Sequence, residues 1–229
     1  MSCILLIGSG GLIGSQIKLS LEKSNSNIRL ISVDQSQRFD LNDRPTIIEF
    51  FKSNSDINYI LNCSGLNDHV SNGSENDNGV TDLAALDAFM QINVKSVCWL
   101  IEDAHSYLPD IKGIVNFSSL YGIRSPFHPA YRQPKSLSYT LSKHALEGVT
   151  RYYSAFYGPD KLRVNAIRVG GIEADAQPLD FKDWFVSRIP LARMAKVEDL
   201  LGVVELLCSE KSAYITGQNF TVDGGYSTW

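Results

Sequence analysis

The chain has 229 residues, of which 44% are hydrophobic and 20% are charged, and its formal net charge is −4. This balance is typical of a globular domain and leaves no large basic excess for nucleic-acid binding. No run approaches the roughly 18 continuous apolar residues that span a membrane, and the apolar run Cys3–Ile7 has no basic leader. The four cysteines lie far apart, which predicts reduced thiols and one cytoplasmic domain over residues 1–229.

Short apolar runs alternate with helical patterns, which predicts a mostly parallel sheet with helices on both faces. The predicted strands are Cys3–Ile7, Ile28–Val33, Ile57–Leu61, Gly113–Phe117, Leu162–Ile167 and Asn219–Val222. The predicted helices are Leu12–Lys23, Pro45–Lys52, Leu83–Tyr107, Ser138–Tyr157 and Val197–Cys208. Two segments are predicted as loops: the polar Asn67–Val80 and the proline-containing Leu120–Leu137, whose length favours a functional role.

A glycine-rich turn joins the first predicted strand to the first helix. It consists of Gly8, Ser9, Gly10, Gly11, Leu12, Ile13 and Gly14. Glycines at such a turn let the backbone approach a pyrophosphate, which then lies at the positive end of the helix. The pattern alone is weak evidence, because glycine turns between a strand and a helix are common.

The end of the second predicted strand strengthens the case for a dinucleotide site. Asp34 lies 20 residues after Gly14, where a carboxylate accepts both hydroxyls of an adenosine ribose. A carboxylate there repels a 2′-phosphate, so NAD(H) is favoured, while the nearby Arg38 keeps NADP(H) open. The alternative is that Asp34 only caps a turn. The remaining expected cofactor contacts are Asp40 and Leu41 at the adenine edge, and Asn62, Cys63, Ser64 and Gly65 after the third strand.

Tyr139 and Lys143 lie four residues apart and therefore on one face of a helix. A phenol has a pKa of about 10, and one positive charge at about 4 Å supplies the roughly 4 kcal/mol that a shift of ~3 units requires. Tyr139 is thus a candidate acid–base group for a substrate oxygen during hydride transfer. Tyr131 and Lys135 have the same spacing, but Pro134 disfavours a helix there. We therefore prefer Tyr139.

Ser119, after a predicted strand, and Asn93, inside a predicted helix, indicate no function by themselves. Together with the glycine turn, Asp34 and the Tyr139/Lys143 pair, they resemble the short-chain dehydrogenase/reductase family over essentially the whole chain. The resemblance extends to two further motifs, Arg163-Val164-Asn165-Ala166 and Val222-Asp223-Gly224-Gly225. The fold it implies is a single α/β domain of the Rossmann type, a doubly wound parallel sheet with helices on both faces.

The resemblance also implies roles for individual residues. Ser119 would orient the substrate oxygen, and Tyr139 would be the acid–base. Lys143 would hold the nicotinamide ribose and lower the tyrosine pKa, and Asn93 would anchor a water relay. The nicotinamide amide would lie against Gly170, Gly171 and Ile172. The family further implies a homodimer or homotetramer.

The sequence departs from the family pattern at three places. The glycine spacing is G-x-x-G-x-x-G, Val169 stands where a proline is usual, and the interval from Ser119 to Tyr139 is longer than usual. The insertion responsible, with the ending after Gly224, is similar to oxidoreductases of bacterial sialic-acid-like and flagellin-sugar pathways.

We therefore expect a cytoplasmic NAD(P)(H)-dependent oxidoreductase that interconverts an alcohol and a carbonyl on a sugar or nucleotide sugar. Four residues of the inserted segment are candidates to contact a phosphate or ring, or simply to pack the loop: Arg124, His128, Tyr131 and Arg132. The alternatives are a 3-oxoacyl-thioester reductase, a small-polyol dehydrogenase and a non-catalytic dinucleotide-binding sensor or scaffold. We expect no metal site, because His69, His105, His128 and His144 have no ligand-like spacing, and no nucleic-acid or membrane partner.

Overall fold

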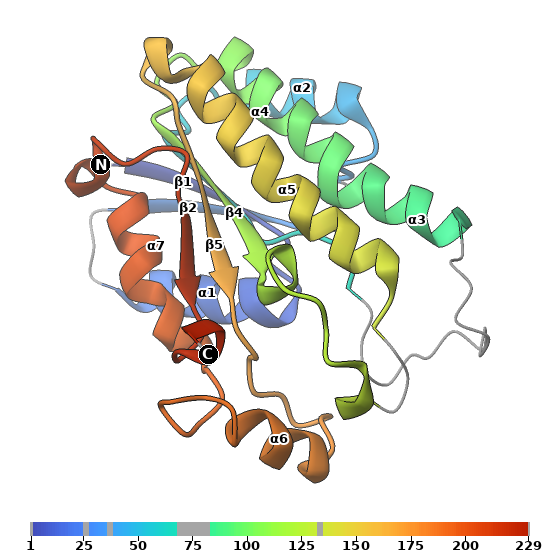
Figure 1. The fold of residues 1–229 in the computed structure, drawn as a ribbon. Helices are drawn as coiled ribbons and strands as arrows, with labels where there is room; N and C mark the ends of the chain where they lie inside the picture. Colours follow the sequence, from blue (N-terminus) through green and yellow to red (C-terminus); the bar gives the residue numbers. More distant parts are fainter. Residues whose placement is uncertain (1, 25–27, 36–38, 68–82, 132–134, 229) are drawn as a thin grey trace.

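A single parallel sheet organises the fold in the computed structural model, which describes residues 2–24, 28–35, 39–67, 83–131 and 135–228 (Figure 1). Its six strands run in the order β2-β1-β3-β4-β5-β6, and every neighbouring pair is parallel. The strands are β1 (Ser2–Ile7), β2 (Ile28–Val33), β3 (Tyr59–Asn62), β4 (Gly113–Ser119), β5 (Arg163–Val169) and β6 (Asn219–Val222). The predicted doubly wound α/β fold is confirmed.

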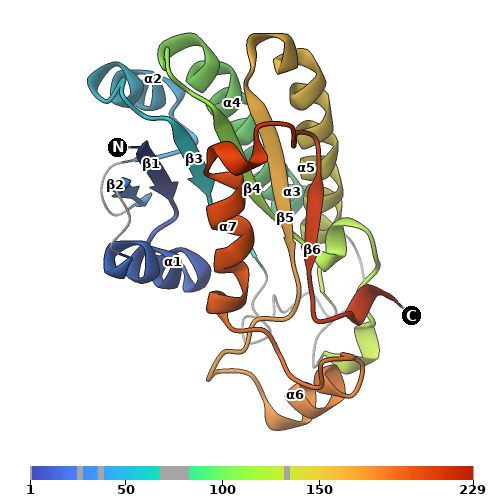
Figure 2. The ribbon, with the colours of Figure 1, turned by 90° about the vertical axis from the view of Figure 1, so that its left-hand side faces the viewer.

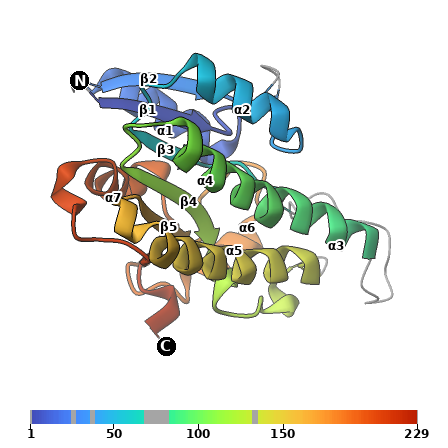
Figure 3. The same cartoon turned by 90° about the horizontal axis from the view of Figure 1, so that it is seen from above.

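Helices cover both faces of this sheet (Figures 2 and 3). On one face lie α1 (Leu12–Lys23) and α7 (Leu201–Leu207), and on the other lie α2 (Arg44–Ser53), α4 (Ser96–Tyr107) and α5 (Leu137–Phe156). The sequence of β1 is apolar without interruption because both of its faces are buried. Leu6 belongs to the hydrophobic cluster that includes residues of α1 and α7 (the α1 and α7 cluster), whereas Leu5 belongs to the cluster on the other face of the sheet, with residues of α2, α4 and α5.

Two predicted helices differ from the structure. The segment predicted as one helix over Leu83–Tyr107 consists of α3 (Leu83–Met90), a π-helical turn at Gln91–Lys95, and α4. The predicted helix Val197–Cys208 begins with a 3₁₀ turn before α7. A further helix, α6 (Leu179–Val186), was not predicted from the sequence.

The predicted loop segments are only partly covered by the structure. Residues 120–137 contain two 3₁₀ turns, Leu120–Gly122 and His128–Ala130, and end at Leu137, the first residue of α5. Most of the predicted loop Asn67–Val80, and with it His69, lies outside the described residues, as do Arg38, Arg132 and Pro134. Within the described ranges, no helix is long and apolar enough to cross a membrane.

The strand order reverses next to β1, because the chain passes from β1 to β2 on one side and then to β3 on the other. In open parallel sheets, ligands bind beyond the carboxyl ends of the strands at such a switch point. A ligand is therefore expected against the turns that follow β1, β2, β3, β4 and β5.

Candidate active site

The turn between β1 and α1 is tightly packed and depends on glycine. Gly8 has a φ of +81°, a left-handed conformation, and its N–H donates to the Val33 carbonyl at 2.9 Å. A Cβ added to Gly14 would lie 2.1 Å from the Gly8 carbonyl oxygen, so the first turn of α1 packs directly on the glycine turn. The first turn of α1 carries no acidic side chain, so its N-terminus suits an anion.

Asp34 follows β2 and its carboxylate faces this turn. A Cβ added to Gly10 would lie 2.6 Å from Asp34 Oδ2, so the absence of a side chain at Gly10 lets the carboxylate lie directly against the turn. This arrangement fits the ribose of a dinucleotide whose pyrophosphate lies on the turn.

The residues proposed for the adenine edge lie nearby, where both have structural contacts. Leu41 is buried in the core, and the Asp40 carboxylate accepts hydrogen bonds from the backbone and side chain of Asn42. Their contact with adenine stays a prediction.

The segment after β3 approaches both the glycine turn and α5. A Cβ on Gly8 would lie 2.8 Å from the Ser64 nitrogen, and a Cβ on Gly65 would lie 3.6 Å from Lys143 Nζ. Asn62 donates to Asn116 Oδ1 at 3.2 Å and accepts from Ser64, which fixes the end of the strand. Cys63 is part of the α1 and α7 cluster, and burial raises the pKa of its thiol, so it is a neutral packing group.

Asn93 lies in the π-helical turn and is almost completely buried. Its side chain accepts from the Leu66 N–H at 2.7 Å and donates to the Leu66 carbonyl and to Ser142 Oγ. It thereby joins three separate parts of the structure: the segment after β3, the helix pair α3–α4, and α5. Single π turns in helices are frequent at functional sites.

Lys143 lies on α5 with 6% of its surface exposed, and its ammonium donates to the Phe117 carbonyl at 2.9 Å. Burial lowers the pKa of Lys143 to about 8, and the nearby Cys63 acts in the opposite direction. Its Nζ lies 5.7 Å from the centre of the Tyr139 ring, one helical turn away. The predicted pair therefore shares one face of α5.

Tyr139 lies in the first turn of α5, whose N-cap Ser136 accepts a hydrogen bond from the Tyr139 N–H. The phenol ring packs edge-on against Phe89 and Tyr121, and only 8% of the residue is exposed. The competing pair does not share a helix, since Tyr131 precedes α5 by six residues. Lys135 instead places its ammonium 4.8 Å from the centre of the Tyr139 ring.

The serines at the end of β4 have different partners. Ser119 Oγ accepts from the Tyr121 N–H at 3.2 Å and caps the 3₁₀ turn that follows. Ser118 instead donates to Glu147 Oε1, and Glu147 forms an ion pair with Arg168 of β5 at 2.7 Å. The side chains of this ion pair are 3% and 12% exposed, so it is a buried support beneath the site.

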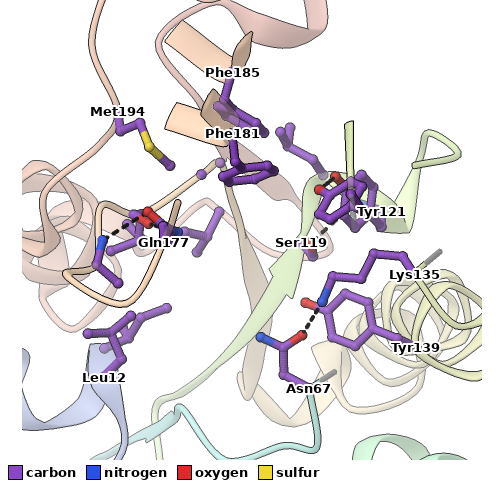
Figure 4. A pocket seen from close by; sticks show the side chains of 18 of the residues that line it. Leu12, Asn67, Ser119, Tyr121, Lys135, Tyr139, Gln177, Phe181, Phe185 and Met194 are labelled. Atoms are coloured by element: carbon purple, nitrogen blue, oxygen red, sulfur yellow. Dashed lines mark hydrogen bonds between the residues drawn. The ribbon is translucent and has the colours of Figure 1, made fainter. Parts of the chain in front are cut away.

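These elements enclose a cavity of about 240 Å³ at the carboxyl edge of the sheet. Figure 4 shows Ser119 beside Tyr139, whose hydroxyl points into the cavity, with Gln177, Phe181 and Met194 on the other side. Lys135 donates to Asn67 at 2.9 Å at one edge. The lining is largely apolar and aromatic with a few polar groups, as is usual for a small-molecule site.

The segment after β5 forms the back of the cavity. Gly170, Gly171 and Ile172 all line it. The Gly170 N–H donates to the Val222 carbonyl, and a Cβ on Gly171 would lie 2.4 Å from Phe185 of α6. Val169, in place of the usual proline, is a regular strand residue paired with Ser119 and Val222.

Several residues of the cavity were not predicted from the sequence. They are Tyr121, Gln177, Phe181, Phe185 and Met194. All except Tyr121 belong to α6 and its flanking loops, which carry no motif, and only the unpredicted helix α6 brings them over the sheet edge. Of the inserted residues, Tyr131 reaches the cavity, whereas Arg124 donates to the Tyr226 carbonyl.

A parallel sheet with this glycine turn, and a tyrosine–lysine pair beside a serine at its carboxyl edge, defines a Rossmann-type oxidoreductase. Residues 22–227 match the short-chain dehydrogenase family described as "Enoyl-(Acyl carrier protein) reductase". The chain belongs to the short-chain dehydrogenase/reductase family of NAD(P)-dependent oxidoreductases.

Three relatives illustrate this membership. The chain is 33% identical over 144 residues to the 3-oxoacyl-(acyl-carrier-protein) reductase FabG of Thermotoga maritima, a match that covers 61% of this chain and 56% of that enzyme. It is 27% identical to the short-chain dehydrogenase virB of Hypocrea virens, over 96% of this chain and 94% of the relative. A short-chain dehydrogenase from Leptospira borgpetersenii, solved with bound NAD+, superposes with a TM-score of 0.82 at 28% identity, covering 99% of this chain and 92% of that one.

Proposed function

We propose that this chain interconverts an alcohol and a carbonyl, with Tyr139 as the acid–base. The observation that carries the proposal is that Ser119 and Tyr139 line one cavity while Lys143 lies a helical turn behind. Ser119 orients the substrate oxygen, and Tyr139 gives that oxygen a proton in reduction or takes it in oxidation. Gly170, Gly171 and Ile172 line the cavity and would hold a nicotinamide, which would supply or accept the hydride when bound. Asn93, held by Leu66 and Ser142, anchors a water relay.

The geometry around Asp34 supports NAD(H) as the preferred cofactor. The carboxylate lies against the glycine turn at Gly10, where it can accept hydrogen bonds from free ribose hydroxyls, whereas a 2′-phosphate would lie against a like charge. The Leptospira relative was solved with bound NAD+. NADP(H) remains the alternative cofactor.

The preferred substrate class is a sugar or nucleotide sugar, consistent with aromatic walls at Phe181 and Phe185 and with polar groups at Gln177 and Lys135. A 3-oxoacyl thioester is the second candidate, because the Thermotoga relative is a 3-oxoacyl reductase and the lining is largely apolar. Turnover of acetoacetyl-CoA, compared with that of oxidised nucleotide sugars, separates the two.

The proposal includes one cytoplasmic domain over residues 1–229 that assembles as a homodimer or homotetramer through α4 and α5. Tyr152 and Phe156 on α5 are 62% and 59% exposed, as expected for side chains that a second copy would cover. Light scattering of the purified protein tests this assembly, and a monomer at micromolar concentration would contradict it.

The first test is thermal stabilisation of the protein by each of the four nicotinamide dinucleotides. A ligand at 100 times its dissociation constant adds about 2.7 kcal/mol to the free energy of unfolding. We expect the largest shift with NADH or NAD+, and a smaller one in Asp34→Ala. Tyr139→Phe should keep the shift and lose at least a hundredfold in turnover. No shift with any of the four would reject the proposed function, and full turnover by Tyr139→Phe would reject the role of the tyrosine.

A further inference from the structure

Tyr131 has no role in the chemistry proposed above, yet it lines the same cavity as Ser119 and Tyr139. It follows the 3₁₀ turn His128–Ala130, and its ring lies 5.2 Å from that of Phe181, centre to centre. Its hydroxyl is hydrogen-bonded to the hydroxyl of Tyr121. The inserted segment thus contributes a phenol to the wall of the cavity rather than a second tyrosine–lysine pair.

The two phenols together have two protons, and the hydrogen bond between them uses one. Tyr121 is the deeper residue, 9% exposed, and in the described part of the chain its hydroxyl has Tyr131 as its hydrogen-bond partner. Leaving a buried donor without an acceptor is unfavourable. Tyr121 therefore donates to Tyr131, and the proton of the half-buried Tyr131 is the one directed to the cavity.

The position of Tyr121 relates this donor to the reacting centre. The Tyr121 ring packs edge-on against the Tyr139 ring at 6.4 Å between centres, and its N–H donates to Ser119. Tyr121 thus contacts Tyr131, Ser119 and Tyr139, so a group bound by Tyr131 lies in the same cavity as the oxygen that Ser119 and Tyr139 hold. Burial raises the pKa of Tyr131 to about 12, so the phenol remains a neutral donor near pH 7.

We propose that Tyr131 binds a second oxygen of the substrate, and that Tyr121 is the residue that positions it. Because Tyr131 accepts a bond from Tyr121, its own O–H becomes a stronger donor. The substrate class that fits is a ketone with a hydroxyl on the neighbouring carbon, or the corresponding diol in the oxidative direction. This inference rests on the proposed function and narrows its substrate: an oxidised sugar has such an arrangement, whereas an unsubstituted ketone does not.

The test compares two ketones that differ by one hydroxyl, 2-hydroxycyclohexanone and cyclohexanone, as substrates for NADH-dependent reduction. One neutral hydrogen bond corresponds to roughly a threefold to tenfold effect. We expect Tyr131→Phe to lower kcat/KM for the hydroxyketone about tenfold and to change it less than twofold for cyclohexanone. Tyr121→Phe should give a loss of about threefold, also confined to the hydroxyketone.

Tyr226→Phe is the matched control, since Tyr226 packs on Phe185 outside the cavity lining. It should leave both substrates unchanged, and all variants should keep the thermal shift with NADH. An unchanged preference in Tyr131→Phe, or an equal loss with both ketones, would overturn the inference.

Binding is measured separately, so that failure of the proposed function can be distinguished. Saturation-transfer NMR on the NADH complex reports binding of each ketone without turnover. A hydroxyketone signal that weakens in Tyr131→Phe, while the cyclohexanone signal does not, supports the role of Tyr131 even if neither ketone is reduced. Equal hydroxyketone signals in wild type and Tyr131→Phe overturn it.

Discussion

Gly14 gives the sharpest test of how the cofactor turn is built. In Gly14→Ala the new Cβ would lie 2.1 Å from the Gly8 carbonyl oxygen and 2.9 Å from its carbonyl carbon. Both atoms belong to the backbone, so α1 must move by about 1 Å to relieve the contact, and such overpacking costs about 1–3 kcal/mol. Alanine favours a helix over glycine by about 1 kcal/mol, which offsets part of that loss.

The net expectation is a loss of up to about 2 kcal/mol in the free energy of unfolding, read from urea denaturation. Because α1 moves away from the turn, we also expect at least tenfold weaker NADH binding. Gly202→Ala in α7 is the matched control, as a Cβ there meets nothing within 4 Å. It should stabilise the protein by up to about 1 kcal/mol and leave NADH binding unchanged. Wild-type stability and affinity in Gly14→Ala would refute this packing argument.

Two further predictions concern buried charges. Burial lowers the pKa of Lys143 to about 8 in the folded state. Above that pH the folded state binds fewer protons than the unfolded state, so the contribution of Lys143 to the free energy of unfolding rises between about pH 8 and 10. Urea denaturation across this range should show a shallower rise in Lys143→Met, and parallel curves for the two proteins would contradict the assignment. Glu147→Gln leaves the Arg168 guanidinium buried without its counter-charge and should destabilise by about 3 kcal/mol, whereas the apolar pair Glu147→Leu/Arg168→Leu should recover most of the loss. Equal stability of Glu147→Gln and wild type in the same assay would show that the ion pair is not a buried support.

The central strands β1, β3, β4 and β5 were predictable because burial on both faces favours short, largely apolar runs, whereas the edge strands β2 and β6 are only partly buried. The bounds of β2 and β6 agree with the predicted ranges, while β4 and β5 each extend two residues further. Those extra residues include Ser118, Ser119 and Val169. They are polar or lie next to glycines, which does not indicate a strand in the sequence. They nevertheless pair across β4 and β5, because pairing with the neighbouring strand decides where a strand ends.

The choice of Tyr139 over Tyr131 followed from local chemistry, since Pro134 disfavours helix before Lys135, and α5 begins at Leu137. The interruption at Asn93 was not predictable in this way. Residues 83–107 read as one helix, and the π turn becomes visible only with the contacts of Asn93 to Leu66 and Ser142. Helix α6 was likewise not predictable, because its eight residues depend on tertiary packing of Phe181 and Phe185.

The bond from Lys143 to the Phe117 carbonyl has an evolutionary consequence. It fastens α5 directly to β4, so the relative position of the serine and the tyrosine does not depend on the chain between them. The residues between the 3₁₀ turn that Ser119 caps and the N-cap Ser136, 123–135, can therefore lengthen, shorten or be exchanged while the reacting groups stay in place. Grafting this stretch onto a relative with a shorter connection should transfer substrate preference without rebuilding the catalytic geometry, which makes the segment a natural unit for evolution and for engineering.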